Sequence, residues 1–238
     1  MKKKIVLILW IFIIGVTLIC VSGYIYLSKL KSQQHYFDDW NEAADSPDQV
    51  EILILRNQSL KLISKDIQMF TNLRVLNLGN NQIETLPPEI GSLLSLEELI
   101  LSSNKINRLP ASIKNLKQLK ILDLNGNLFF EIPDQLTDLD SLRVLLMANN
   151  KITEVKLPKQ LREVDLADNQ ITNVTEEIVF IENLLKIDLQ NNRITKIHKQ
   201  IFSMPSLSEI ILKGNQLDAE TLELYKRFNT HQTDAIPK

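Results

Sequence analysis

LRVLNLGNNQIETLPPEIGSLLS, residues 73–95, is followed directly by LEELILSSNKINRLPASIKNLKQ, residues 96–118. Leucines, an asparagine and a proline fall at the same places in both stretches. The pattern L-x-x-L-x-L-x-x-N-x-L occurs eight times, and the copies start 23 residues apart except for one interval of 19. One copy cannot bury its leucines alone, whereas stacked copies form a continuous core. The sequence therefore predicts a solenoid over residues 50–217, with copies starting at Val50, Leu73, Leu96, Leu119, Leu142, Leu161, Leu184 and Leu207.

The second and third leucines of each copy are two residues apart, which is the period of a strand. In the second copy these are Leu76 and Leu78, which we expect to point into the coil, while Val75 and Asn77 point out. The return path has apolar residues at helical spacing after a proline, which suits the start of a helix. We therefore expect a parallel sheet on the concave side and short helical or 3-10 turns on the convex side.

An asparagine occupies the ninth position of every copy except the first, which has Gln58. The chain leaves the strand there, and its turn leaves backbone groups unpaired inside the coil. A side-chain amide both donates and accepts hydrogen bonds, so it satisfies such groups. The sequence predicts a buried ladder formed by Asn81, Asn104, Asn127, Asn150, Asn169, Asn192 and Asn215.

The fifth copy, residues 142–160, is four residues shorter than the others. It lacks the pair of apolar residues that Ile90 and Leu93 provide in the second copy. We expect an extended turn here in place of a helix. A tolerated deletion, a hinge and a partner contact are alternative explanations.

Both ends of a solenoid need closure, because an open stack exposes its core and a strand edge. Residues 32–49 are predicted to form a capping helix that stops at Pro47, with inward side chains at Tyr36, Phe37, Trp40 and Ala44. Residues 218–238 are predicted to form a second capping helix and a tail. Asp218 is its expected N-cap, and its inward side chains are Leu222, Tyr225 and Phe228.

These motifs resemble those of the leucine-rich repeat superfamily. The L-P-x-x-I-x-x-L continuation at residues 86–93 and 109–116 is similar to the Ras-suppressor-like subgroup and to many bacterial repeat proteins. The resemblance implies an α/β solenoid of horseshoe shape. It covers residues 50–217 and implies a recognition module.

Residues 1–31 precede the cap and contain no charge between Lys4 and Lys29. About 20 apolar residues cross a bilayer as a helix, so residues 5–28 are predicted to form one transmembrane helix. The lysines before it favour a cytoplasmic N-terminus and an exported repeat domain. The alternative is a signal peptide cleaved near residues 21–23, which would give a secreted protein.

Charge and composition exclude several function classes. Five of the 27 basic residues lie in residues 1–31, so the rest has 22 basic against 29 acidic residues and a net charge of −7. Nucleic-acid binding requires a basic surface and is not expected. The only cysteine is Cys20. No phosphate loop, nucleophile motif or metal-ligand spacing is found, so we predict no enzyme, no cofactor and no metal.

The outward strand positions divide the concave face into an apolar N-terminal half and an acidic C-terminal half. An exposed apolar patch often marks a protein contact, although β-branched residues also simply suit strands. We predict a protein or peptide partner that contacts Ile52, Ile54, Val75, Ile100, Ile121, Val144 and Leu146. The alternative is a secreted or envelope-bound adhesive protein. Asp123, Asp165 and Asp188 are expected to form a solvated acidic face.

Overall fold

The structure is a computed structural model that describes residues 35–234. The segment predicted to cross a membrane, residues 5–28, lies outside this range, as do residues 32–34 of the predicted cap and the end of the predicted tail. Within residues 35–234, no helix has the length and apolar character that a membrane span requires.

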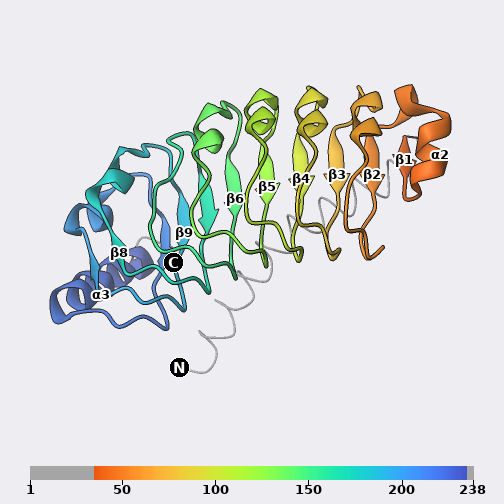
Figure 1. Ribbon diagram of the computed structural model, residues 1–238. Coiled ribbons are helices and arrows are strands. Elements are labelled where there is room, and N and C mark those ends of the chain that lie inside the picture. Colours follow the sequence, from red (N-terminus) through yellow and green to blue (C-terminus); the bar gives the residue numbers. More distant parts are fainter. Residues whose placement is uncertain (1–34, 235–238) are drawn as a thin grey trace.

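The main feature is a parallel sheet of nine short strands, one for each coil plus one at the front edge (Figure 1). Its order follows the chain apart from β8 and β10, which lie elsewhere. The strands are β1 (Tyr36–Phe37), β2 (Ile52–Ile54), β3 (Val75–Asn77), β4 (Glu98–Ile100), β5 (Ile121–Asp123), β6 (Val144–Leu146), β7 (Glu163–Asp165), β9 (Lys186–Asp188) and β11 (Glu209–Ile211). We call the face of this sheet directed away from the core the concave face.

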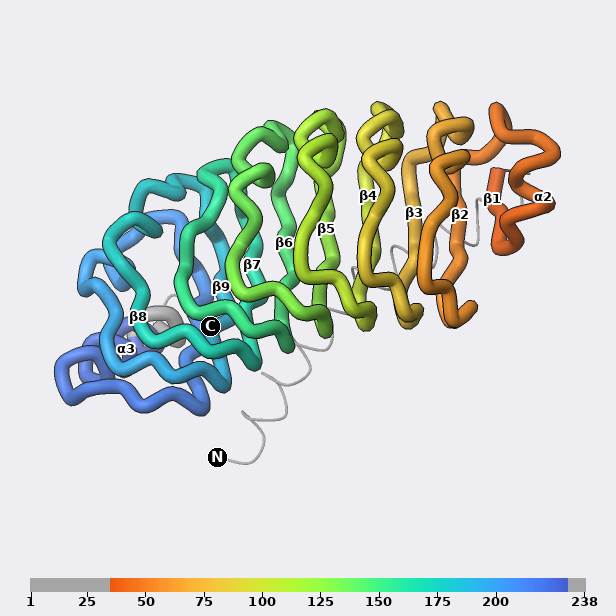
Figure 2. Tube along the Cα trace, in the orientation of Figure 1, coloured from red at the N-terminus to blue at the C-terminus, as the bar shows by residue number. Residues whose placement is uncertain are grey.

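The opposite, convex side is formed by 3-10 helices, as predicted from the spacing of its apolar residues (Figure 2). These are η2 (Lys65–Met69), η3 (Pro88–Ser92), η4 (Ala111–Asn115), η5 (Asp134–Asp138), η6 (Glu176–Phe180) and η7 (Lys199–Ser203). The short fifth coil has no helix between η5 and η6, which confirms the predicted extended turn. A small second parallel pair, β8 (Asn173–Val174) with β10 (Lys196–Ile197), was not predicted.

The core fills the space between the sheet and the 3-10 helices. In the second coil, Leu76 and Leu78 are fully buried, and Ile90 and Leu93 close the coil from the convex side. The matching residues of each neighbouring coil pack above and below them in a single cluster. Burial of a leucine or isoleucine side chain contributes about 1.5–3 kcal/mol, so the repeated leucines dominate the stability of the fold.

The predicted asparagine ladder is confirmed. The Asn127 amide donates to the carbonyls of Leu101 and Leu124 at 3.0 and 3.1 Å, and its Oδ1 accepts from the Ile106 N–H at 3.0 Å. The other ladder asparagines make equivalent contacts, and Asn81 through Asn192 are buried. Gln58 at the front edge instead donates to the Asp38 carbonyl.

The residue before each ladder amide has a left-handed backbone. Only glycine enters this region freely, and asparagine, aspartate and serine tolerate it better than bulky residues. All eight coils satisfy this requirement, which explains why the eighth position contains only such residues: Asn57, Asn80, Ser103, Gly126, Asn149, Asp168, Asn191 and Gly214.

The front cap differs from the single helix predicted for residues 32–49. Tyr36 and Phe37 form β1, which pairs in parallel with β2 and covers its open edge. The helix α2 (Trp40–Asp45) is only six residues long, and the 3-10 helix η1 (Pro47–Gln49) follows it. The prediction was wrong because pairing with β2 provides hydrogen bonds that helical spacing alone does not reveal. Ala43, rather than the predicted Ala44, is the buried alanine.

The rear cap is the helix α3 (Ala219–Asp234), which begins after Asp218 as predicted. Asp218 Oδ1 accepts from the Thr221 N–H at 2.8 Å. Tyr225 and Phe228 pack against the core, also as predicted. Leu222 does not, because it is 39% exposed while Thr221 is buried in its place.

Candidate functional site

The concave face presents two columns of side chains, because the parallel strands pair without a shift in register. The first column runs through Tyr36, Ile52, Val75, Glu98, Ile121, Val144, Glu163, Lys186 and Glu209. The second runs through Ile54, Asn77, Ile100, Asp123, Leu146, Asp165, Asp188 and Ile211. Neighbours within a column are about 4.8 Å apart, so adjacent residues of one kind form a continuous surface.

The first group on this face is the front cluster, which consists of Tyr36, Ile52, Ile54 and Val75. Ile52 and Val75 are only 1% and 7% exposed, so their predicted exposure is wrong. Tyr36, which sequence analysis placed on a helix, stands beside Ile52 in the register of β1 and β2. The front cluster is therefore an interior contact of the cap, and it leaves Ile54 half-buried at its margin.

The second group is the central patch, which consists of Ile100, Ile121, Val144 and Leu146. All four are half-buried, so each presents part of its side chain outward. Ile121 and Val144 are paired neighbours. Leu146 lies two residues beyond Val144 on the same face, and Ile100 is diagonal to Ile121. The structure thus brings four of the seven predicted residues together around the half-buried Asp123. Glu98 and Asn77 separate them from the front cluster.

The third group is the acidic end, which consists of Glu163, Asp165, Asp188 and Glu209. Asp165 and Asp188 are paired neighbours on β7 and β9. Lys186 lies between the two glutamates in the first column and forms an ion pair with Glu209 at 3.0 Å. The acidic end adjoins the central patch directly, because β6 pairs with β7.

The aspartates of the second column do not form the solvated face that sequence analysis predicted. Asp123, Asp165 and Asp188 each accept a hydrogen bond from the backbone N–H two residues later, at 2.9–3.0 Å. Asp188 is only 6% exposed. Burial raises the pKa of all three carboxyls, and burial together with nearby Asp165 raises the pKa of Asp188 to about 6. These side chains therefore also have a structural role where the strands end.

A row of alternating charges borders the sheet on the N-terminal side. Arg74 contacts Glu51 at 3.8 Å and Glu97 at 2.9 Å, and Lys120 contacts Glu97 at 2.6 Å. Burial opposes ionisation of Glu97, but the hydrogen bonds from Lys120 and Arg74 outweigh it and lower its pKa. The row links successive coils at the margin of the central patch.

Two family models match the chain in succession. A "leucine-rich repeat region" model matches residues 49–157, and a "leucine rich repeat" model matches residues 159–217. The chain belongs to the leucine-rich repeat family. Among curated proteins, none matches it. Across residues 35–234, this leucine-rich repeat protein has no group of three or more histidine, cysteine or acidic residues placed to hold a metal ion.

Solved leucine-rich repeat structures share the fold. A leucine-rich repeat protein of Leptospira interrogans aligns with a TM-score of 0.60 and 24% identity, over 76% of this chain and 59% of its own. A second structure is the ectodomain of the Arabidopsis thaliana membrane receptor kinase GASSHO1/SCHENGEN3 in complex with Casparian strip integrity factor 2. It aligns with a TM-score of 0.62 and 30% identity, over 71% of this chain and 22% of its own. The plant peptide hormone receptor RGFR1, in complex with RGF2, aligns with a TM-score of 0.60 and 27% identity, over 71% of this chain and 29% of its own. The chain thus spans less than two thirds of each of these proteins.

Proposed function

We propose that this leucine-rich repeat protein is a non-enzymatic interaction module that binds a protein or peptide on its concave face. The partner would contact the central patch, and its basic residues would lie over the acidic end. The observation that carries this proposal is the half-exposed apolar surface of Ile100, Ile121, Val144 and Leu146 around Asp123. It lies beside the carboxyl groups of Glu163 and Asp165 on β7. A stacked sheet holds both groups at fixed positions.

The apolar residues of the second column are not required by the fold. At Asp123 a carboxylate accepts the N–H two residues later, so this column accommodates a polar side chain. In the coil of Leu146, the Ala148 N–H is instead bound by Asn125 Oδ1 from the previous coil, at 2.6 Å. Ile100 and Leu146 therefore leave apolar surface where the architecture accepts a polar residue, which favours a binding role.

Two of the structural neighbours support the class of partner. The receptor kinase ectodomain and the peptide hormone receptor were both solved in complex with a second molecule named in their descriptions. They share the repeat fold with this chain at 27–30% identity. A peptide with an apolar segment next to a basic segment fits the central patch and the acidic end.

The proposed location is the membrane, with residues 5–28 as the anchor, the N-terminus in the cytoplasm and the repeat domain exported. The support is the uncharged run between Lys4 and Lys29 and the lysines that precede it. Cell fractionation and N-terminal sequencing of the mature protein distinguish this arrangement from the cleaved, secreted or envelope-bound alternative. A retained Met1 in the membrane fraction is expected.

The binding proposal is tested by photo-crosslinking of the full chain in the cells that produce it. A benzophenone amino acid replaces Ile121 in the central patch, or Leu94 as a control, which is 62% exposed outside the concave face. We expect a discrete adduct at position 121 and none at position 94. The adduct is expected to disappear when Ile100→Asp and Leu146→Asp are combined.

A matched double variant, Leu62→Asp with Leu94→Asp, adds the same two charges at side chains that are 72% and 62% exposed. It is expected to keep the adduct. Thermal unfolding followed by circular dichroism establishes that each variant is folded. An adduct that survives the folded Ile100→Asp and Leu146→Asp variant, or that forms equally at position 94, would contradict the proposal.

A further inference from the structure

The convex side is interrupted at the fifth coil. The 3-10 helices η2 to η5 pack side by side, as do η6 and η7, but the fifth coil contributes no helix between η5 and η6. Its chain runs from Val155 to Gln160 as an extended turn, where the third coil uses residues 109–118. A recess of about 470 Å³ lies at this position, and we call it the convex groove.

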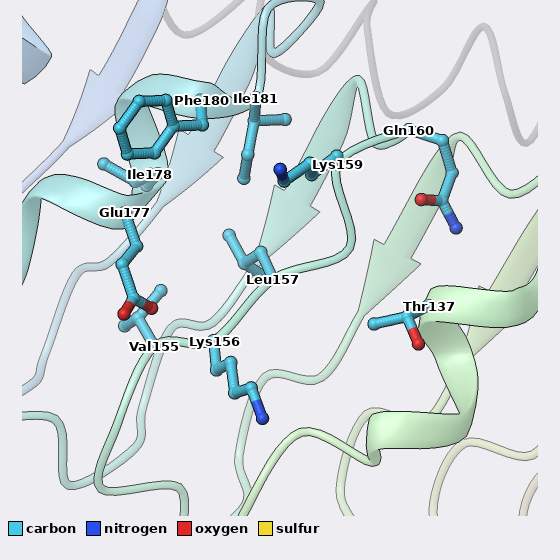
Figure 3. A pocket seen from close by; sticks show the side chains of 10 residues that line it. All are labelled: Thr137, Val155, Lys156, Leu157, Lys159, Gln160, Glu177, Ile178, Phe180 and Ile181. Carbon is cyan, nitrogen blue, oxygen red and sulfur yellow. The ribbon is translucent and has the colours of Figure 1, made fainter.

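The convex groove has an apolar floor. Val155, Leu157, Ile178, Phe180 and Ile181 line it (Figure 3). Phe180 is 59% exposed, and Val155 is half-buried although its counterpart Leu109 in the complete third coil is only 5% exposed. Ile178 and Ile181 are nevertheless buried, and the position of Phe180 is exposed in complete coils as well, for example at Ser92 and Asn115. The missing helix therefore uncovers Val155 and Leu157, which lie beside the exposed ring of Phe180.

The coil beneath the groove is nevertheless closed. Gln160 donates from its side-chain amide to the carbonyls of Leu136 and Leu139 at 3.0 and 2.8 Å. These carbonyls belong to η5 and the residue after it, and they would otherwise face the gap. Because the backbone is satisfied in this way, the fold keeps the groove open without a filling segment.

The rim of the groove carries Lys156 and, as Figure 3 shows, the opposite charges of Lys159 and Glu177. Both side chains are exposed, and neither has an ion-pair partner within residues 35–234. Lys156 is different, because it pairs with Asp134 at 2.8 Å. Glu177 also lies within electrostatic range of Lys156. The rim thus provides Lys159 and Glu177, neither of them in an ion pair, to a ligand that crosses the apolar floor.

We infer that the convex groove binds a short helical segment of a partner protein, which takes the place of the missing turn. In the complete third coil, Ile113 and Leu116 fill this position with two aliphatic side chains three residues apart. The occupant would present the same pair. By charge complementarity, a basic residue just before the pair would lie beside Glu177, and an acidic residue just after it would lie beside Lys159.

The probe is a fluorescent synthetic peptide with the sequence of residues 108–118, carrying Ser112→Lys and Lys117→Glu to match the rim. A charge-reversed peptide carries Ser112→Glu and keeps Lys117. Binding is measured by fluorescence anisotropy with the full chain in lipid nanodiscs. We expect saturable binding of the matched peptide and at least tenfold weaker binding of the charge-reversed peptide.

Two protein variants locate the binding. In the filled variant, the sequence of residues 109–118 replaces residues 155–160, which restores a 23-residue repeat. The filled variant is expected not to bind the matched peptide and to unfold at a higher temperature. Phe180→Asp is expected to weaken binding at least tenfold, whereas Leu62→Asp, on a side chain 72% exposed outside the groove, leaves it unchanged.

Lys159→Glu tests the charge complementarity. This variant is expected to bind the matched peptide more weakly. A peptide with Ser112→Lys that keeps Lys117 is expected to bind the variant with the original affinity. Absence of saturable binding to the wild-type chain would overturn the inference. Equal binding to the filled variant, or equal binding of both peptides, would also overturn it, since the groove would then lack a selective site.

Discussion

The side-chain amide of Asn127 donates to the carbonyl of Leu101, the residue that follows β4 in the preceding coil, at 3.0 Å. One side chain therefore joins two coils at a point that water does not reach. Because each ladder asparagine repeats this contact with the coil before it, the array is bonded along its length inside the core as well as through the sheet.

Asn127→Ala removes three buried hydrogen bonds and leaves the Ile106 N–H without a side-chain partner. The Leu101 and Leu124 carbonyls keep the side-chain amides of Asn104 and Asn150 as donors. A buried group left unsatisfied costs about 1–3 kcal/mol. We expect a loss of that size in the free energy of unfolding, measured by urea denaturation. The control is Asn107→Ala, which is exposed and should change little. Equal stability of both variants would argue against the ladder.

Asp188→Asn tests the buried carboxyl. Burial raises the pKa of Asp188 to about 6, so between about pH 4 and pH 6 the folded state holds a proton that the unfolded state releases. The contribution of the Asp188 carboxyl to the free energy of unfolding therefore falls as pH rises through this window. The asparagine keeps the acceptor for the Gln190 N–H, as Asn77 does for Gly79.

We expect Asp188→Asn to raise the free energy of unfolding by about 1–3 kcal/mol at pH 7 and to leave it nearly unchanged at pH 4. Denaturant titrations at several pH values measure this. The exposed Asp138→Asn removes the same charge from the surface and serves as the control. If Asp188→Asn raised the free energy of unfolding by the same amount at every pH, burial of the charge would not be the cause.

Trp40→Ala weakens the front cap. Trp40 packs edge-on against Phe70 with ring centroids 5.3 Å apart, and it covers the first coil. Truncation of a large aromatic residue in a core costs about 3–5 kcal/mol, and we expect about 2–3 here because Trp40 is only half-buried. Hydrogen exchange should accelerate first in β2. Unchanged exchange there would indicate that α2 is not a cap.

Gly91→Ala tests the spacing of the convex helices. A Cβ at Gly91 in η3 would lie 2.6 Å from the Ser112 Cβ in η4, with the Ser112 backbone also in the way. Such overpacking costs about 1–3 kcal/mol. Gly79→Ala is the matched control, since its Cβ would lie 3.2 Å from the Asn77 Oδ1 and meet no backbone closer than 3.5 Å. Thermal unfolding should show the larger decrease in Tm for Gly91→Ala.

The sequence of the chain was sufficient to predict the repeat and its core. The pair Leu76 and Leu78 reveals the strand, and the asparagine nine positions into each coil reveals the buried turn. The apolar pair recurs in every coil and the asparagine in seven of the eight, so each copy confirms the others. The left-handed position before each asparagine was also present in the sequence, in residues such as Gly126, but it was missed because several residue types share it.

Features that depend on the neighbouring coil were decided by the tertiary structure. Tyr36 has the spacing of a helix, yet it pairs with β2 because an open strand edge provides backbone partners. Ile52 and Val75 alternate as exposed strand residues do, yet the added strand buries them.

For the same reason, the seven predicted contact residues separated into a front cluster and a central patch only when their register was known. The missing residues of the fifth coil indicated from the sequence that the convex side changes there. The apolar floor and the charged rim of the convex groove, however, are formed by side chains of two coils. Sequence periodicity determines which way a side chain points within its own coil. What covers that side chain depends on the adjacent coil, and only the stacked structure determines it.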